Sequence, residues 1–160
     1  MDANDLAQYI EKQGIDAEVV LLDEHTPTVE AAAEAVGVRP EQIVKSVLFV
    51  VKEGDNDYRP LLVIANGLSR VDYKSLAEHA GTSRRRLRMA RPKQVLAMTG
   101  YPVGTVPPFG HAQALPTLLD QGVTRQEEVY AGGGAINALM RLPVDELQRV
   151  LQAPVVAVTE

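Results

Sequence analysis

The chain has 160 residues, of which 46% are hydrophobic and 23% are charged, a size and composition typical of one compact soluble domain. A formal net charge of −5 excludes the broad basic surface of proteins that grip many nucleic-acid phosphates, so any RNA contact is expected to be local. The absence of cysteine excludes disulfides, a thiol nucleophile and cysteine-ligated zinc.

The first 66 residues are predicted to hold two helices and three strands. A glycine just past the last periodic residue, Gly14 and then Gly37, is expected to end each helix. Thr28 is a plausible N-cap of the second helix, which is rich in alanine. In chain order we expect a helix over residues 6–13, a strand over 17–22, a helix over 28–36 and a hairpin of strands over 43–51 and 59–65.

The remaining residues are predicted to form short elements around one irregular segment. Asp72 is a candidate helix cap, and Pro92 favours the first turn of another helix. Residues 100–111 hold three Gly and three Pro, which excludes regular structure there. In chain order we expect a helix over 72–79, a strand over 87–90, a helix over 92–98, a strand over 129–131, a helix over 143–151 and a strand over 154–158. This irregular alternation predicts a mixed sheet with packed helices, an α/β or α+β fold, in a single domain over residues 1–160.

The expected subcellular location follows from two features that the sequence lacks. Its first five residues are acidic and do not show the basic-then-apolar order of a signal peptide. No apolar run approaches the roughly 20 residues that span a bilayer. We therefore expect a cytoplasmic protein without a membrane partner.

Lys45 is unusual because it stands inside an apolar run over residues 43–51. Burying an unpaired ammonium group costs several kcal/mol, roughly, so a strand seldom holds one without a reason. Strand alternation puts Lys45 on the same face as Val47 and Phe49. If that face is the core, the ammonium must emerge into a cleft. An edge-strand lysine or a stem that reaches out to water explains the pattern equally well.

Two glycine-rich segments are candidates for binding a ligand through the backbone. In residues 100–111, proline fixes φ and glycine allows close approach, so N–H groups can point rigidly at a carbonyl or an oxyanion. The alternative is a structural connector. Gly132–Gly134 follows a predicted strand and could cradle a phosphate, adenosine or peptide-like group. It lacks a dinucleotide or P-loop spacing, and a plain flexible turn is the simpler interpretation.

Other kinds of site find little support. His25, His79 and His111 are far apart in sequence and have no metal-ligand spacing, so no metal or other cofactor is predicted. Neither Ser46 nor Ser69 has an identifiable base, and no Gly-x-Ser-x-Gly elbow is present. The basic cluster over residues 84–93 could meet phosphates or could simply form a solvated face.

In this order, the features resemble the YbaK/ProX family of freestanding editing domains, which also occur inserted in bacterial prolyl-tRNA synthetases. The resemblance covers nearly the whole chain and rests on the segments 26–32, 43–49, 72–77, 101–110, 115–120 and 132–134. It implies a mixed, partly barrel-like β-sheet surrounded by helices. It also implies hydrolysis, without a metal, of the ester between a mischarged amino acid and the terminal adenosine of tRNA.

Carried over by position, the resemblance implies that Lys45 is the catalytic lysine. It makes Gly104 and Pro108 the ends of a Gly-x-x-x-Pro loop whose backbone helps to place the aminoacyl carbonyl. The glycine triplet is expected to close the pocket. The substrate-binding residues expected in this way are Thr28, Ser46, Gly104, Thr105, Val106, Pro107, Pro108, Phe109, Gly110, Gly132, Gly133 and Gly134. Ala131 and Ala138 depart from the pattern, because many relatives hold Ser and Asp there.

The resulting hypothesis is a trans-editing deacylase for a small amino acid of the Cys, Ala or Ser type, for example on tRNA for proline. The expected partner is the acceptor end of mischarged tRNA, with prolyl-tRNA synthetase as a second candidate and no DNA partner. Water would attack the ester with help from a ribose hydroxyl, while backbone donors of the loop stabilise the oxyanion. The alternative is a non-catalytic module that binds tRNA or aminoacyl-adenylate in association with a synthetase.

Overall fold

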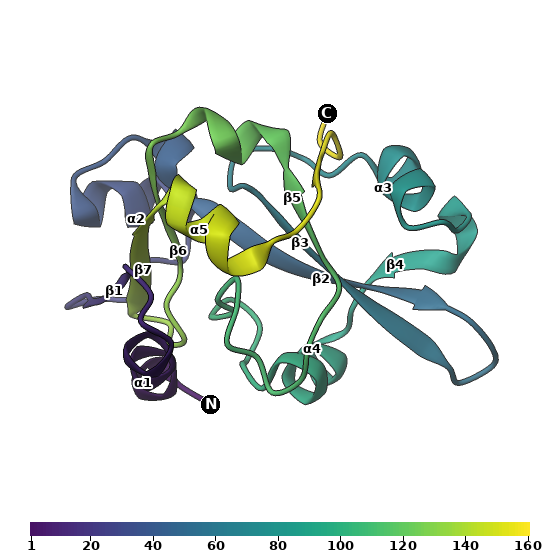
Figure 1. The fold of residues 1–160 in the computed structure, drawn as a ribbon, viewed down its shortest axis with the longest axis horizontal. Helices are drawn as coiled ribbons and strands as arrows, with labels where there is room; N and C mark the ends of the chain where they lie inside the picture. Colours follow the sequence, from purple (N-terminus) through teal and green to yellow (C-terminus); the bar gives the residue numbers. More distant parts are fainter.

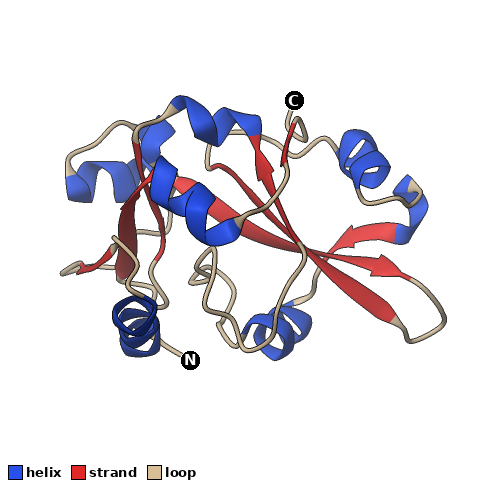
Figure 2. Cartoon of the chain, in the orientation of Figure 1, coloured by secondary structure: helices blue, strands red, loops and turns tan.

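The computed structural model describes residues 1–160 and contains five α-helices and eight β-strands (Figures 1 and 2). The helices are α1 (Ala3–Gln13), α2 (Val29–Val36), α3 (Tyr73–His79), α4 (Pro92–Thr99) and α5 (Val144–Leu151). The strands are β1 (Glu18–Leu21), β2 (Val44–Lys52), β3 (Tyr58–Asn66), β4 (Leu87–Met89), β5 (Thr117–Asp120), β6 (Glu128–Gly132), β7 (Ala138–Pro143) and β8 (Val155–Val156). Three short 3-10 helices, Pro40–Gln42, Arg84–Arg86 and Gln121–Arg125, join them. No helix combines the length and apolarity needed to cross a membrane.

The strands form two sheets. The larger has the order β4-β2-β3-β5-β8, antiparallel from β4 to β3 and parallel from β3 to β8. The smaller is the antiparallel sheet β1-β7-β6. The two meet where Ile43, just before β2, forms a parallel bridge with Tyr130 of β6. The predicted mixed α+β fold is confirmed, with the β-structure divided into two sheets that touch at this bridge.

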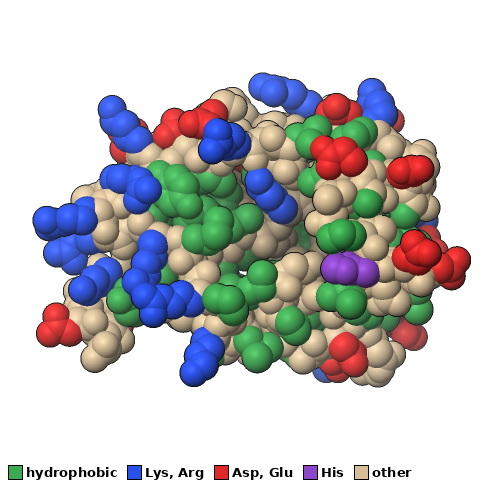
Figure 3. Space-filling view, turned by 180° about the vertical axis from the view of Figure 1, so that it is seen from behind, with side chains coloured by type: hydrophobic (Ala, Val, Ile, Leu, Met, Phe, Trp, Pro, Cys, Tyr) green, Lys and Arg blue, Asp and Glu red, His purple; other side chains and the backbone are tan.

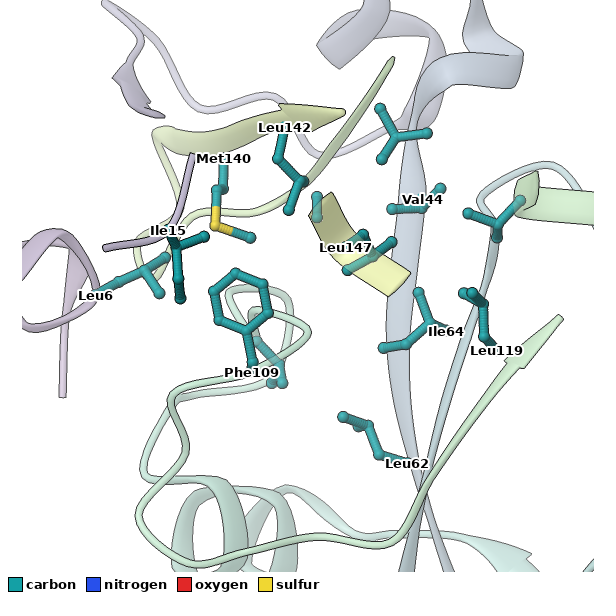
Figure 4. Packing of buried hydrophobic residues seen from close by; sticks show 14 of the residues in the cluster. Leu6, Ile15, Val44, Leu62, Ile64, Phe109, Leu119, Met140, Leu142 and Leu147 are labelled. Carbon is teal, nitrogen blue, oxygen red and sulfur yellow. The ribbon is translucent and has the colours of Figure 1, made fainter. Parts of the chain in front are cut away.

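The main hydrophobic core lies between the two sheets, and α1 and α5 cover it (Figure 4). Phe109 points into this space from an irregular loop. A second core fills the opposite face of the larger sheet under α3 and includes Phe49, Val63 and Leu76. Because both faces of β2 and β3 are covered, their sequences read as nearly continuous apolar runs rather than alternating ones.

Local signals in the sequence located most of the helices. The side chain of Thr28 accepts a hydrogen bond from the Ala31 amide as the N-cap of α2. Gly14 and Gly37 end α1 and α2 in the left-handed conformation, as predicted. Helix α1 begins earlier than expected, because Asp2 and Asp5 form a reciprocal capping box.

Two strands were missed. Strand β7 has alternating burial, with Ala138, Met140 and Leu142 buried, but Arg141 is its only polar residue, so the sequence itself shows no period of two. Strand β5 is only four residues long and is recognisable mainly from its partners β3 and β8. The strand expected over 154–158 is reduced to the two residues of β8.

Candidate active site

The segment between α4 and β5 is a tightly anchored loop despite its lack of regular structure. Residues 105–109 are buried, and the Thr105 amide and hydroxyl both donate to the Pro102 carbonyl, at 3.1 and 2.8 Å. The Phe109 ring packs in the main core, 6.1 Å from the Tyr9 ring centroid. We call residues 104–110 the Gly/Pro loop. Its anchoring means that its backbone groups are held in fixed directions.

His111 supports this loop from behind. Its Nε2 lies 2.7 Å from the Pro107 carbonyl oxygen, which can only accept, so Nε2 carries the hydrogen. Burial lowers the pKa of His111, against a smaller opposing effect of the Pro107 carbonyl. A neutral imidazole that braces the loop fits both observations.

The glycine triplet packs directly on the Gly/Pro loop. The Gly134 amide donates to the Thr105 carbonyl at 2.9 Å. A Cβ added to Gly132 would lie 2.2 Å from the Val106 carbonyl oxygen, far inside contact distance. Only glycine allows the two backbones to approach so closely. The structure therefore brings together the two glycine-rich segments that the sequence singled out.

Several amides of the Gly/Pro loop have no acceptor within the protein. The N–H groups of Gly104, Val106, Phe109 and Gly110 donate to no protein atom. Val106 is only 7% exposed, so its free N–H is notable. A buried amide without a partner costs about 1–3 kcal/mol. Such a donor, held rigidly, is what an oxyanion or a substrate carbonyl requires.

Lys45 lies at the start of β2 with a half-buried side chain. Its Nζ donates to the Ser69 carbonyl at 2.6 Å and forms no ion pair with a carboxylate. Desolvation by burial lowers the pKa of Lys45. At Lys45 strand β2 pairs with β3, whereas β4 pairs with β2 only at residues 49–51. The ammonium opens into a pocket of about 380 Å³, lined by Val47, Ser69, Arg70, Val71, Tyr73, Met89 and Glu160.

The ammonium and the Gly/Pro loop lie on different faces of β2. Val44 and Leu48 pack in the same core as Val106 and Phe109, whereas Lys45 points to the opposite face. The loop residues 108–111 line a separate pocket of about 440 Å³. The side-chain contacts therefore do not bring the ammonium of Lys45 and the Gly/Pro loop together in one pocket.

The backbone of Lys45 is nevertheless close to the glycine triplet. The parallel bridge between Ile43 and Tyr130 aligns the start of β2 with β6, and both Lys45 and Gly132 follow two residues later. Ser46 lies on the face of β2 that points toward the loop, and its Oγ is buried without a hydrogen-bond partner. The Ser46 hydroxyl is thus a free polar group on the face of β2 that points toward the Gly/Pro loop, whereas the Lys45 side chain lies on the opposite face.

Comparison with known sequences decides the family. The profile of the aminoacyl-tRNA editing domain matches residues 23–150. The chain belongs to the aminoacyl-tRNA editing domain family. As a member of this family, which includes trans-editing enzymes, it is an aminoacyl-tRNA deacylase.

Relatives of this editing domain support the assignment. YwhH, an uncharacterized protein of Bacillus subtilis, is 33% identical over 81% of this chain and 78% of its own length. EbsC of Enterococcus faecalis, described as a candidate Cys-tRNA(Pro)/Cys-tRNA(Cys) deacylase, is 27% identical over 66% of this chain and 60% of its own. The proline–tRNA ligase of Thermosipho melanesiensis is 30% identical over 68% of this chain, which spans only 18% of the ligase.

A solved structure agrees over nearly the whole editing domain. It is described as a candidate trans-editing enzyme for prolyl-tRNA synthetase and superposes with a TM-score of 0.89 at 35% identity. The match covers 99% of this chain and 96% of that one. The two folds therefore correspond in both sheets and in the elements that carry the Gly/Pro loop.

Other positions in the editing domain have clear structural roles or were not anticipated. The Thr28 hydroxyl is engaged as a helix cap, which accounts for this residue without a ligand. Ser69, Tyr73 and Met89 surround Lys45 but come from three separate segments, so no sequence spacing links them. No three His, Asp or Glu side chains are grouped so as to hold a metal ion. Figure 3 shows a hollow near the middle of one face, with a cationic side chain lying in it.

Proposed function

We propose that this editing domain acts in trans in the cytoplasm and hydrolyses mischarged tRNA that carries a small amino acid of the Cys, Ala or Ser type. The acceptor end of tRNA for proline is the first candidate substrate, and prolyl-tRNA synthetase is a candidate partner. The described substrates of EbsC support this choice, as does the description of the trans-editing structure as an enzyme for prolyl-tRNA synthetase. The resemblance of the ordered motifs to freestanding editing domains supports it independently.

The free amides of the Gly/Pro loop carry the chemical proposal. A water molecule attacks the ester carbonyl carbon, the carbonyl oxygen becomes an oxyanion, and the N–H groups of Gly104 and Val106 stabilise it. The bond to the ribose oxygen then breaks, and the released ribose hydroxyl takes up the proton that the water loses. Removing one such donor typically costs about 3–4 kcal/mol of transition-state stabilisation. No metal takes part in this scheme.

The neighbouring ribose hydroxyl orients the water, because the loop offers no strong general base. The only ionisable side chain bonded to the Gly/Pro loop is His111, and its Nε2 is occupied by the Pro107 carbonyl. An aminoacyl ester is already activated toward hydrolysis, so positioning and oxyanion stabilisation suffice. Ser46, with an unpartnered buried Oγ on the loop face, is a candidate to hold the substrate carbonyl or the water.

Lys45 holds the terminal nucleotide by its phosphate. Its Nζ is bonded to a neutral carbonyl rather than to a carboxylate, so a phosphate oxygen can replace Ser69 with a stronger charged hydrogen bond. The lowered pKa of Lys45 reflects incomplete solvation, and an arriving anion would restore stabilisation of the charged form. This role fits a lysine that faces away from the Gly/Pro loop.

Selection by size follows from the side chains at the loop. Val106 and Phe109 are buried and fixed, so the space beside the loop amides is limited by rigid walls. One added methylene changes affinity by only about 1–3 kcal/mol, which predicts that several small amino acids are accepted.

Deacylation assays with a panel of mischarged tRNAs test the function. We expect hydrolysis of tRNA carrying Cys, Ala or Ser, and little hydrolysis of tRNA carrying a large aliphatic or aromatic residue. Binding of the same tRNAs without any hydrolysis would favour the alternative of a non-catalytic module. Activity that needs an added divalent metal ion would contradict the metal-free scheme.

Substitution of Lys45 tests its role. Lys45→Ala should lose most deacylation of tRNA while the fold stays intact, whereas Lys52→Ala at the exposed end of the same strand should have no effect. An aminoacyl-adenosine substrate has no phosphate, so Lys45→Ala should hydrolyse it at close to the wild-type rate. Equal losses on both substrates would place the ammonium at the ester instead, and wild-type activity on tRNA would remove Lys45 from the site.

A further inference from the structure

The charges of the chain are strongly segregated along the sequence. Between Glu78 and Asp120 there is no acidic residue, yet this stretch holds six Lys and Arg side chains: Arg84, Arg85, Arg86, Arg88, Arg91 and Lys93. All 21 acidic residues lie elsewhere, together with the other ten basic residues. Although the whole chain has a net charge of −5, the segment between Glu78 and Asp120 has a charge of +6. We call these six residues the basic face.

The basic face lies on one end of the molecule. Its residues belong to the 3-10 helix Arg84–Arg86, the edge strand β4 and the start of α4. In Figure 3 most of the blue side chains lie in the left half of the view and most of the red ones in the right half. The separation seen along the sequence is thus kept in three dimensions, and the low net charge does not prevent local binding of phosphates.

None of the six cations is paired with a carboxylate, although acidic residues outnumber basic ones in the chain. Three arginines are instead held by neutral groups. The guanidinium of Arg84 lies 4.2 Å from the Tyr73 ring centroid, and that of Arg88 lies 4.6 Å from the Tyr58 ring centroid. Arg86 donates to the Lys52 carbonyl. These contacts orient the guanidinium groups without neutralising them, which lowers the entropy cost of binding an anion.

The basic face borders the pocket of Lys45. Met89 of β4 and Tyr73 of α3 both line that pocket. The Tyr73 ring is the one beneath Arg84, so Arg84 lies beside the pocket, whereas Arg88 pairs with Val50 and points to the opposite face of the sheet. A phosphate backbone that contacts Arg84 is therefore close to the pocket that holds the ammonium of Lys45. A set of unpaired cations beside a single half-buried ammonium fits a nucleic-acid strand with a free end.

We infer that the basic face binds the backbone phosphates of the tRNA acceptor stem and directs the phosphate of its 3′-terminal nucleotide to Lys45. This inference rests on the proposed function for the identity of the RNA. The contacts are to phosphates, so they fix the position of the stem and contribute little to the choice among tRNA sequences.

A triple variant tests the inference. Arg85, Arg91 and Lys93 are exposed and their side chains form no hydrogen bond or ion pair, so Arg85→Gln/Arg91→Gln/Lys93→Gln should fold normally, as a thermal melt would confirm. The matched control removes the same charge elsewhere, with Lys12→Gln/Arg39→Gln/Arg125→Gln. Both are compared with wild type for binding of uncharged tRNA over a range of salt, for deacylation of mischarged tRNA and for hydrolysis of aminoacyl-adenosine.

The inference predicts a specific pattern. The triple variant should bind tRNA at least about tenfold more weakly near 0.1 M salt, and the slope of log affinity against log salt should fall by about 2. Hydrolysis of aminoacyl-adenosine should stay within about twofold of wild type, since that substrate has no stem and no phosphate. The control triple should bind tRNA as wild type does.

Three results would overturn the inference: unchanged affinity and salt slope in the triple variant, an equal loss in the control triple, or wild-type binding to anionic lipid vesicles with none to tRNA. A different result separates this inference from the proposed function. If wild type hydrolyses no mischarged tRNA but its tRNA binding depends on the three cations as predicted, the basic face stands and the deacylase proposal for tRNA fails.

Discussion

The contact between the glycine triplet and the Gly/Pro loop can be tested with one methyl group. In Gly132→Ala the new Cβ would lie 2.2 Å from the Val106 carbonyl oxygen, 2.8 Å from its carbonyl carbon and 3.2 Å from the Thr105 carbonyl oxygen. Ordinary contacts begin near 3.4 Å, and all three neighbours are backbone atoms, which cannot rotate away. The loop or β6 must therefore move by about 1 Å.

A shift of this size has calculable consequences. Displacement of catalytic groups by about 1 Å can cost about 100-fold in rate, which corresponds to about 2.7 kcal/mol of transition-state stabilisation. Overpacking of a buried site costs about 1–3 kcal/mol of folding stability. For a chain of this size, that corresponds to a fall of about 2–12 °C in the melting temperature. We expect a folded variant with a loss in kcat/KM much larger than its loss in stability would suggest.

The assay compares Gly132→Ala with Gly54→Ala, a hairpin glycine whose added Cβ would make only an ordinary 3.6 Å contact. Both variants are measured for deacylation of a mischarged tRNA well below their melting temperatures, and for binding of uncharged tRNA. Gly132→Ala should lose about 100-fold in kcat/KM with little change in tRNA binding, and Gly54→Ala should match wild type. A Gly132→Ala variant that deacylates within about twofold of wild type would refute the reasoning that links this contact to catalysis.

Two further predictions concern stability. Because burial lowers the pKa of His111 below its usual 6.5 in the folded state, the unfolded chain binds more protons just below that pH. The folding stability of the wild type should therefore fall as the pH is lowered from 7 through 6.5 toward the native pKa of His111. The variant His111→Gln can still donate a hydrogen bond to Pro107, and its stability should depend less on pH when thermal melts at pH 7 and 5.5 are compared. Asp120 is 1% exposed and accepts hydrogen bonds from the Gly122 and Val158 amides and the Thr159 hydroxyl. Asp120→Ala should cost about 3 kcal/mol in urea unfolding, and Asp120→Asn, which keeps one acceptor oxygen, should cost less; equal costs would show that the acceptor is unimportant.

The sequence alone determined the local structure and the nature of the loop. The helices and the central hairpin were located correctly because their signals depend only on neighbouring residues. These signals are the glycines that end helices, the Thr28 cap and the apolar runs. The density of Gly and Pro over residues 100–111 correctly excluded regular structure, because these residues act through their own backbone geometry. The resemblance of the ordered motifs correctly identified the family.

Only the tertiary structure decided which residues meet. The resemblance implied one site for Lys45 and the Gly/Pro loop, but alternation along β2 turns the ammonium to the opposite face, where it donates a hydrogen bond to Ser69. Residue spacing favoured a plain turn for the glycine triplet, and only the resemblance implied that it closes a pocket; in the structure Gly132 packs on Val106 at a distance that only glycine permits. Both outcomes depend on the pairing of strands far apart in the chain, and short-range patterns carry no information about that pairing.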